Sequence, residues 1–213
     1  MKRTDDVYIH LAADVSNFPF LDICWKNERL FVTGKYIFKG AYKGVFCSDN
    51  FNLKIEIPSD FPSTIPKVFE IDNKIPKDYH KNSSTELCLG TPVDLYVKWK
   101  ERTFSFFIKE IVNPYLYRWI YFNKFGYEPW DDRSHGKNGI IEFYSEYLEI
   151  KADFNKVFKF LYILINGNVR SNTFCPCGSG RKIKSCHMHK LNKLLKKVPK
   201  ETFQYEFRSL MNK

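Results

Sequence analysis

Apolar and polar positions alternate along the first half of the chain. Between residues 51 and 57 the odd positions are Phe, Leu, Ile and Ile, and the even positions are Asn, Lys and Glu. This is the pattern of a strand with one buried face. Residues 20–25, 30–38 and 67–71 also read as strands, and a proline-rich loop over residues 58–66 precedes the last of them. The pattern predicts an antiparallel four-stranded meander rather than a series of βαβ units.

After residue 100 the apolar positions repeat at the spacing of a helix. The first such segment covers residues 104–112, and Pro114 should break or kink it because proline lacks an N–H and crowds the preceding turn. Further helices are expected over residues 115–122 and 140–150, and from the N-cap Asp153 to Asn166–Gly167. The expected fold class is therefore α+β, with helices after the meander.

The basic charge of the chain is concentrated near its end. The 213 residues carry a formal net charge of +10, and ten Lys/Arg stand against two Glu between residues 181 and 213. The near-neutral remainder argues against nucleic-acid binding by the whole chain. Leucines spaced among the lysines of residues 190–197 predict a short amphipathic helix. We expect this tail to be a solvated surface, or to dock an acidic protein or nucleic acid.

The sequence also indicates a compartment. No apolar signal segment follows the initial MKRTDD, and the most apolar stretch, residues 158–165, is too short to span a bilayer. A disulfide scaffold would be shorter and denser in cysteine than this chain, which has six. We expect a cytoplasmic protein with reduced thiols and no membrane contact. Cys24 and Cys47 are interpreted as structural residues.

Four closely spaced residues indicate a metal site: Cys175, Cys177, Cys186 and His187. Three thiolates and one imidazole complete a tetrahedral zinc centre, and a centre with four protein ligands is structural rather than catalytic. His189 is an alternative fourth ligand. Two glycines let the backbone turn between the first two cysteines and the last, and zinc binding would supply folding energy to a segment with little core of its own.

The pattern C-x-C-x-S-G-x(5)-C-H resembles the SEC-C motif, which is best known for protein docking at the C-terminus of the bacterial translocation ATPase. The resemblance implies a binding appendage. We therefore expect two domains. Residues 1–167 would form the main domain, and residues 168–213 would form a SEC-C zinc knuckle with a basic helical tail.

A second candidate site surrounds Cys88. His80 and Asn82 stand eight and six residues upstream of it, after the meander and a stretch with the form P-x-x-x-P-x-V at residues 62–68. Residues 15–125 resemble the ubiquitin-conjugating enzymes, in which a His-Pro-Asn tripeptide precedes the catalytic cysteine of a Cys-Leu pair. The resemblance implies a UBC-like fold and a thioester on Cys88. Lys81 replaces the proline, and Thr85 stands where a glycine is usual.

The sequence around Cys88 is similar to that of the bacterial branch of this family, whose signatures match Leu87-Cys-Leu-Gly90 and Trp130…His135-Gly136…Gly139-Ile140…Tyr144. Such proteins belong to anti-phage defence operons, notably CBASS systems. The implied target is the C-terminus of a cyclic GMP-AMP synthase-like nucleotidyltransferase. A chain of this length has no room for an adenylating domain, so we expect a separate activating enzyme or an already reactive acyl donor.

Each residue of this second site has an expected role. A thioester requires a thiolate that is also a good leaving group, hence Cys88. Asn82 would donate a hydrogen bond to the oxyanion, as its family counterpart does. His80 either orders the loop or acts as a base. His135 either faces Cys88 as a base or lies in a solvated turn that Trp130 anchors.

The departures at Lys81 and Thr85 leave an alternative function open. The same fold, without catalysis, would be a binding module that docks partners through its zinc knuckle. A nucleic-acid adaptor that uses the knuckle and the basic tail is compatible with either reading.

Overall fold

The structure is a computed structural model that describes residues 2–81, 85–131, 133–134, 136–167 and 172–211. The chain forms two compact units. Unit 1 consists of Met1–Leu89 and Lys98–Asp131, and unit 2 consists of Gly90–Val97 and Asp132–Lys213. The chain therefore passes from unit 1 to unit 2 and back before it enters unit 2 again. Unit 1 contains the sheet and is α+β, whereas helices make up the regular secondary structure described in unit 2.

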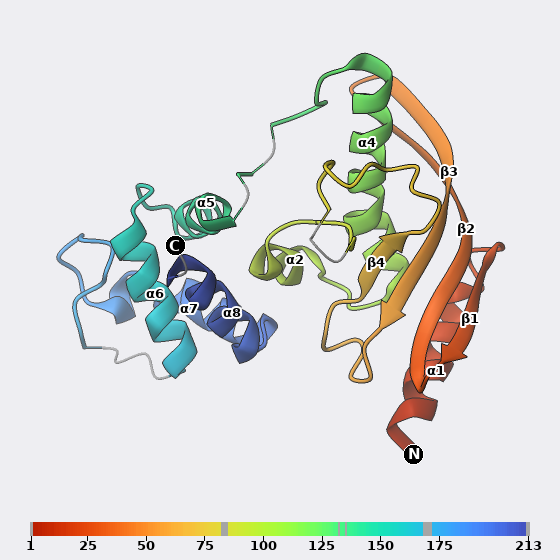
Figure 1. Cartoon of the computed structure of the whole chain (residues 1–213). Helices are drawn as coiled ribbons and strands as arrows, with labels where there is room; N and C mark the ends of the chain where they lie inside the picture. Colours follow the sequence, from red (N-terminus) through yellow and green to blue (C-terminus); the bar gives the residue numbers. More distant parts are fainter. Residues whose placement is uncertain (1, 82–84, 132, 135, 168–171, 212–213) are drawn as a thin grey trace. The chain divides into compact units, whose positions relative to one another are not determined.

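The sheet of unit 1 is the expected antiparallel meander, with strand order β1-β2-β3-β4 (Figure 1). The strands are β1 Leu21–Lys26, β2 Arg29–Tyr42, β3 Val45–Ile57 and β4 Lys67–Glu70. Each of the four predicted strand segments overlaps one of them. The two long strands form a hairpin whose register pairs Leu30 with Ile57 and Val32 with Ile55.

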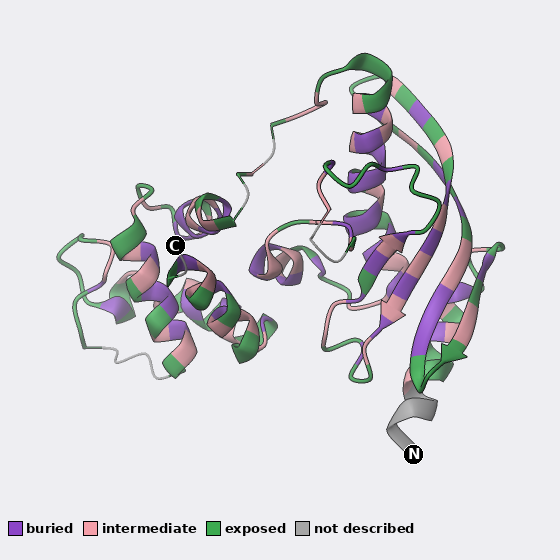
Figure 2. Cartoon of the chain, in the orientation of Figure 1, coloured by how far each residue is buried: buried purple, intermediate pink, exposed green. Residues whose placement is uncertain are grey.

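One face of this sheet forms the core of unit 1. Val32, Leu53 and Ile55 are fully buried, whereas the residues between them in β2 and β3 are mostly exposed or half-buried (Figure 2). The alternation predicted for residues 51–57 is therefore confirmed, and the apolar positions are the buried ones. Burial of this face in the correct register fixes which side chains point outward, because a slip of one residue would exchange the two faces.

Helices cover the buried face. Helix α1, Lys2–Val15, packs on β1, and α4, Asn113–Phe125, packs on β2 and β3. Between them along the chain, α3 spans Phe104–Phe107 and a π-helical turn spans Ile108–Val112. The predicted interruption at Pro114 takes the form of this turn, in which the Asn113 N–H donates to the Ile108 carbonyl. Pro114 then lies in the first turn of α4, where a missing N–H leaves no hydrogen bond unmade.

Unit 2 is a group of helices (Figure 1): α2 Pro92–Lys98, whose last residue returns to unit 1, α5 Gly136–Leu148, α6 Phe154–Asn166, a 3₁₀ turn η2 Ile183–Ser185, α7 Met188–Lys197 and α8 Lys200–Met211. The predicted limits of α6 are confirmed. Asp153 caps it by accepting a hydrogen bond from the Lys156 N–H, and Gly167 ends it in the left-handed conformation.

The domain boundary expected between residues 167 and 168 falls inside unit 2. Helix α6 packs against α7 and α8, and α5 packs against α6 and α8. The helices before residue 167 therefore share one core with the helices that follow the Cys/His segment. Val157, Leu161, Leu194 and Phe203 are fully buried in it.

A buried carboxylate lies inside unit 2. Glu206 in α8 is completely buried and accepts hydrogen bonds from the Val93 N–H at 3.0 Å and from the Tyr144 hydroxyl at 2.9 Å. Burial raises the pKa of Glu206 to about 7, with the nearby Asp94 adding to the rise and the two hydrogen bonds opposing it. Within the described residues, no helix is long and apolar enough to cross a membrane.

We expect Glu206 to make unit 2 less stable as the pH rises. The unfolded chain loses this proton near the ordinary glutamate pKa and the folded chain near 7, so stability is lost between those values. Glu206→Gln keeps an acceptor for the Val93 N–H and removes the charge. The variant should match the wild type near pH 4.5 and exceed its unfolding free energy by about 3 kcal/mol at pH 8. Urea unfolding at several pH values measures this difference, and equal pH profiles would contradict it.

Candidate functional site

The segment that leads into Cys88 is joined to the end of the sheet. The Leu87 N–H donates to the carbonyl of Val68 in β4 at 2.8 Å. Leu87 also forms an isolated antiparallel bridge with Lys81. The backbone just before the cysteine is therefore held by β4 and by the chain that follows His80.

The backbone of Cys88 is fixed by the carbonyl of His80. The Cys88 N–H donates to this oxygen at 2.7 Å, and the Tyr115 hydroxyl of α4 donates to the same oxygen at 3.2 Å. Tyr115 also donates to the Tyr79 carbonyl. Burial raises the pKa of Tyr115 well above its ordinary value, and the neighbouring Tyr79 and Cys88 raise it further. Tyr115 therefore remains a hydrogen-bond donor beside the half-buried cysteine.

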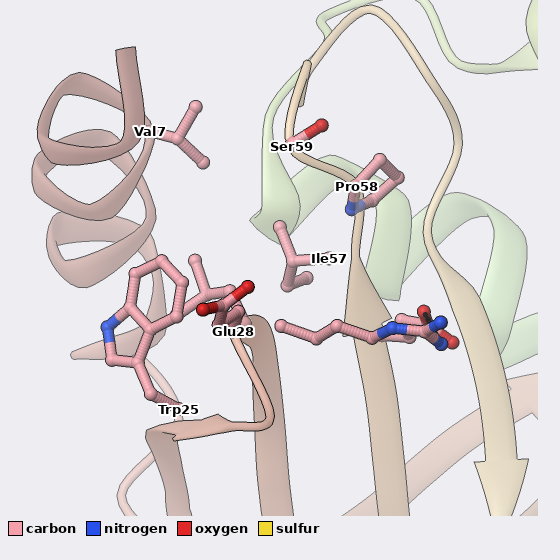
Figure 3. A pocket seen from close by; sticks show the side chains of 9 residues that line it. Val7, Trp25, Glu28, Ile57, Pro58 and Ser59 are labelled. Atoms are coloured by element: carbon pink, nitrogen blue, oxygen red, sulfur yellow. Dashed lines mark hydrogen bonds and ion pairs between the residues drawn. The ribbon is translucent and has the colours of Figure 1, made fainter. Parts of the chain in front are cut away.

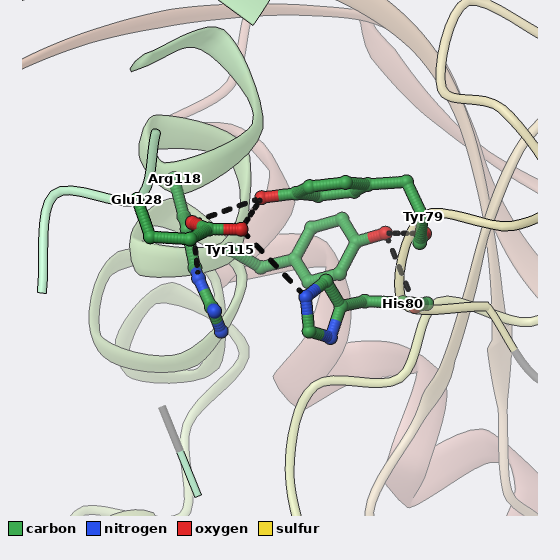
Figure 4. A network of polar contacts seen from close by, with 5 residues as sticks. All are labelled: Tyr79, His80, Tyr115, Arg118 and Glu128. Atoms are coloured by element: carbon green, nitrogen blue, oxygen red, sulfur yellow. Dashed lines mark hydrogen bonds and ion pairs between the residues drawn. The ribbon is translucent and has the colours of Figure 1, made fainter. Parts of the chain in front are cut away.

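A carboxylate faces the side chain of His80 (Figure 4). Glu128 accepts a hydrogen bond from Arg118 Nε at 2.7 Å and one from the Tyr79 hydroxyl at 3.4 Å. His80 Nε2 lies 3.8 Å from Glu128 Oε1, and the His80 ring meets the Tyr79 ring edge-on at a centroid distance of 4.8 Å. The imidazole is thus oriented by a ring on one side and a carboxylate on another. Arg118 in turn holds the carboxylate in place.

Two of the predicted site residues, Asn82 and His135, lie outside the described residues, so their roles stay predictions. The loop before His135 is anchored by Trp130. Its ring stacks on Tyr117 at a centroid distance of 5.6 Å and an interplanar angle of 14°, and meets Tyr42 edge-on at 5.0 Å.

Lys81 is the residue that replaces the family's proline, and its ammonium group is buried. The side chain is 1% exposed, and Nζ donates to the Ile75 carbonyl at 2.6 Å. Nζ also lies 3.8 Å from a carboxylate oxygen of Glu70, whose side chain is fully buried and which accepts the N–H groups of Asp72 and Ile75. Burial lowers the pKa of Lys81, and Glu70 opposes this change. The ion pair ties the residue after His80 to the end of β4.

Thr85 occupies the position where the family usually has glycine, and it adopts φ = 67°. This left-handed conformation is free of steric strain for glycine and unfavourable for a β-branched residue. The backbone at this position therefore has the shape that glycine favours, although the side chain is that of threonine.

The expected metal ligands meet in unit 2. The ligand atoms of Cys175, Cys177, Cys186 and His187 all lie within 4.8 Å of one another. His187 Nδ1 lies 3.1 Å from the Cys175 sulfur and 3.2 Å from the Cys186 sulfur, and the Cys177 and Cys186 sulfurs are 3.6 Å apart. Sulfurs that share a tetrahedral zinc ion with bonds of 2.3 Å lie about 3.8 Å apart. The cluster is therefore compatible with zinc, and His187, not His189, is its fourth member.

The groups around the cluster orient its ligands and favour metal binding. His187 Nε2 lies 2.8 Å from the carbonyl of Leu148 in α5, which fixes the ring so that Nδ1 faces the thiols. Burial raises the pKa of Cys177, but hydrogen bonds with Ser179 and the other cysteines together outweigh burial and lower this pKa to about 6. Arg181 donates to the Cys186 sulfur at 3.5 Å. The lowered pKa favours the thiolate form of Cys177, and the Arg181 cation would offset part of the negative charge of a metal-bound three-thiolate set.

Backbone turns bring the cysteines together. Gly178 and Gly180 have φ values of 85° and 72°. This is the left-handed region, which glycine adopts without steric strain. The Cys175 N–H donates to the Arg181 carbonyl at 2.8 Å and closes the loop. The tight turn predicted from the two glycines is therefore present.

A surface hollow of about 310 Å³ lies elsewhere in unit 1, between α1 and the β1–β2 turn (Figure 3). Trp25 lines one side, and Arg29 pairs with Glu56 at 3.1 Å on another. Its other polar lining residues are Glu28 and Ser59, and we assign no ligand to it.

Sequence reasoning did not identify Glu70, Tyr115 or Glu128 as parts of the Cys88 site. Tyr115 and Glu128 act through contacts with a segment far away in the chain, and Glu70 pairs with Lys81 across the intervening loop. The only local signal was the lysine inside the tripeptide, because a buried lysine requires an acidic partner.

A comparison with models of known protein families finds no match, and neither does a comparison with curated proteins.

Each partner of the Lys81–Glu70 ion pair should be important for stability as long as the other partner is present. Lys81→Met leaves a buried carboxylate without its cation and should lower the unfolding free energy by about 3–5 kcal/mol. The double variant Glu70→Gln, Lys81→Met is neutral at both positions and should recover at least about half of this loss. Lys77→Met, at an exposed lysine of the same loop, is the matched control. Urea unfolding followed by tryptophan fluorescence measures all four proteins, and a silent Lys81→Met would contradict the prediction.

The Cys/His cluster should bind a single zinc ion through His187. His187→Ala should lose zinc at chelator concentrations that leave the wild type loaded, because an imidazole ligand is missing. His189→Ala is the matched control and should retain the metal. Elemental analysis and a competitive zinc indicator measure this, and zinc loss in both variants or in neither would be the contrary result.

Proposed function

We propose that this chain carries an acyl group as a thioester on Cys88 and transfers it to an amine of a target protein, in the manner of a ubiquitin-conjugating enzyme. The observation that supports this most directly is the placement of Cys88. It is a half-buried thiol on a segment joined to the end of a four-stranded meander, with its amide held by the carbonyl of His80.

Two further features agree with a UBC-like fold for unit 1. The chain runs from the meander through a proline-rich loop to a cysteine segment, which is the order of the family resemblance. Thr85 has the backbone conformation of the glycine usual at its position. Lys81 lacks the rigidity of the usual proline, but its buried ion pair with Glu70 supplies an anchor at the same point of the loop.

The chemistry would proceed in two exchanges at one carbonyl carbon. The Cys88 thiolate attacks the acyl carbon of an activated donor, the C–S bond forms, and the donor's leaving group departs. A target amine then attacks the thioester, the C–N bond forms, and the Cys88 thiolate leaves while the amine loses a proton. The side-chain amide of Asn82 would donate to the oxyanion in both exchanges, a contribution of roughly 3–4 kcal/mol in other enzymes.

The position of His80 favours a role in ordering the loop over a role as a base. Its backbone carbonyl binds the Cys88 amide, and its ring is held between Tyr79 and Glu128. We propose that His80 shapes the loop. The proton of the amine would then go to another group, for which His135 stays the candidate from the sequence.

The partners follow from the family resemblance. We propose an activating enzyme as acyl donor and a cyclic GMP-AMP synthase-like nucleotidyltransferase as acceptor, in bacterial anti-phage defence. The Cys/His segment would be a SEC-C zinc knuckle that docks a partner. Next to it, α7 buries Leu191 and Leu194 and exposes Lys193 and Lys196, as expected for a basic docking face.

The departures at Lys81 and Thr85 favour a second candidate, a binding module with the same fold and no catalysis. In that case an alkylating probe would label Cys88 only after denaturation. Failure to label Cys88 in the native protein would support this candidate, and Cys47, which is buried, is the internal reference for a protected thiol in the same sample.

The proposal predicts a covalent adduct on Cys88. The protein, co-expressed with the products of genes adjacent to its own and purified without reductant, should gain the mass of an acyl group that hydroxylamine removes. Cys88→Ala should abolish both adduct and product, and Cys88→Ser should at best form a slower oxyester. Cys24→Ala is the control and should keep the adduct. Intact mass spectrometry reads the result, and unchanged product in both Cys88 variants would refute the proposal.

A further inference from the structure

The hydroxyl of Tyr115 lies between two successive backbone carbonyls of the segment before Cys88 (Figure 4). It is 3.2 Å from the Tyr79 oxygen and 3.2 Å from the His80 oxygen. A hydroxyl has one proton to donate, so the two carbonyls share it in a three-centre hydrogen bond. Tyr115 comes from the first turn of α4, and all of these residues belong to unit 1. One hydroxyl of α4 therefore binds both peptide groups that flank the Cα of His80.

The backbone of His80 has a conformation that this hydroxyl favours. His80 has φ = 41°, in the left-handed region that is unfavourable for most residues other than glycine. The φ and ψ angles of His80 set how its two flanking peptide groups are turned relative to each other. A change to an extended or right-handed backbone would rotate one carbonyl away, and a single hydroxyl could no longer bind both. The three-centre bond therefore stabilises the left-handed conformation.

The His80 carbonyl is also the acceptor of the Cys88 amide, at 2.7 Å. A carbonyl oxygen has two lone pairs and can accept both donors. Tyr115 and Cys88 thus meet at one atom with no residue between them, so a shift of this oxygen changes the position of the Cys88 amide directly. Tyr115 is buried, and burial raises the pKa of its hydroxyl. The donor therefore keeps its proton at neutral and mildly alkaline pH.

We infer that Tyr115 is a positioning residue for Cys88, because its hydroxyl fixes the carbonyl to which the Cys88 amide is bound. The inference rests on Cys88 being the functional cysteine of the proposed function. Tyr115 acts through His80 and touches neither the acyl group nor the incoming amine. Its consequence is that the helix packed on the sheet sets where the thiol is presented.

The test compares variants that differ only at the para position of one ring. Tyr115→Phe removes the hydroxyl and keeps the ring. Tyr117→Phe is the matched control, because Tyr117 lies on the same helix, is also buried, and donates its hydroxyl to the Val45 carbonyl at 3.0 Å. Replacement of Tyr115 by para-aminophenylalanine keeps a donor where the hydroxyl was. Replacement by para-methylphenylalanine fills nearly the same volume and donates nothing.

Exchange of the Cys88 amide proton is read by NMR of the full-length, zinc-loaded protein, labelled with a heavy nitrogen isotope on its cysteines. The chain has six cysteines, so the Cys88 amide gives one of six signals. Cys24 in β1 and Cys175, whose N–H donates to the Arg181 carbonyl in unit 2, are internal references. The rate at which iodoacetamide labels Cys88 is measured on the same proteins by peptide mass spectrometry.

We expect Tyr115→Phe and the para-methyl variant to speed exchange of the Cys88 amide by roughly two- to tenfold, as loss of one neutral hydrogen bond would. Both should also change the rate at which Cys88 is labelled. The para-amino variant and Tyr117→Phe should match the wild type at Cys88 in both measurements. The amides of Cys24 and Cys175 should exchange at the wild-type rate in the Tyr115 variants.

Three outcomes would overturn the inference. They are unchanged exchange of the Cys88 amide in the para-methyl variant, equal acceleration in the para-amino variant, and faster exchange with an unchanged rate of Cys88 labelling. If Tyr115→Phe loosens unit 1 as a whole and speeds exchange at Cys24 as well, the comparison of the para-amino with the para-methyl variant decides between the same outcomes. Neither measurement needs a thioester, so a failure of the proposed transfer reaction is distinguishable from a failure of this inference.

Discussion

One carbonyl oxygen organises the surroundings of Cys88. The backbone of His80 adopts a left-handed conformation, φ = 41°, which is uncommon outside glycine, and its carbonyl accepts both the Cys88 amide and the Tyr115 hydroxyl. Helix α4, the loop and the cysteine segment therefore meet at this atom. The buried ion pair of Lys81 holds the next residue in place, which lets the strained backbone persist.

Local chemistry in the sequence was enough to predict the sheet and several element limits. The period of two along β3 has a single buried face as its cause, and Asp153 and Gly167 delimit α6 by side-chain capping and by a left-handed turn. The Cys/His cluster was predictable for a similar reason. Its members are close in sequence, so short turns at Gly178 and Gly180 suffice to bring them together.

Contacts between distant segments were not predictable in this way. The pair Glu128–His80 joins residues far apart in the sequence, and a single sequence does not show which distant residues will be in contact. Helix α2 is too short for a helical period to be visible. Helix α1 did carry a signal, because Leu11 and Val15 are buried at a spacing of four. The expected boundary at residue 167 ignored the core that α6 shares with α8.

The alternation of the chain between the two units has a consequence for how the protein can be assembled or divided. Because Val93 in α2 donates to Glu206 in α8, a chain synthesised only through residue 131 contains a helix whose buried Val93 still lacks this partner. A cut at residue 131 would separate residues 90–97 from the rest of unit 2. A fragment meant to isolate unit 1 would therefore carry a short apolar helix that belongs to the other unit, and the native contacts of that helix form only once α8 has been synthesised.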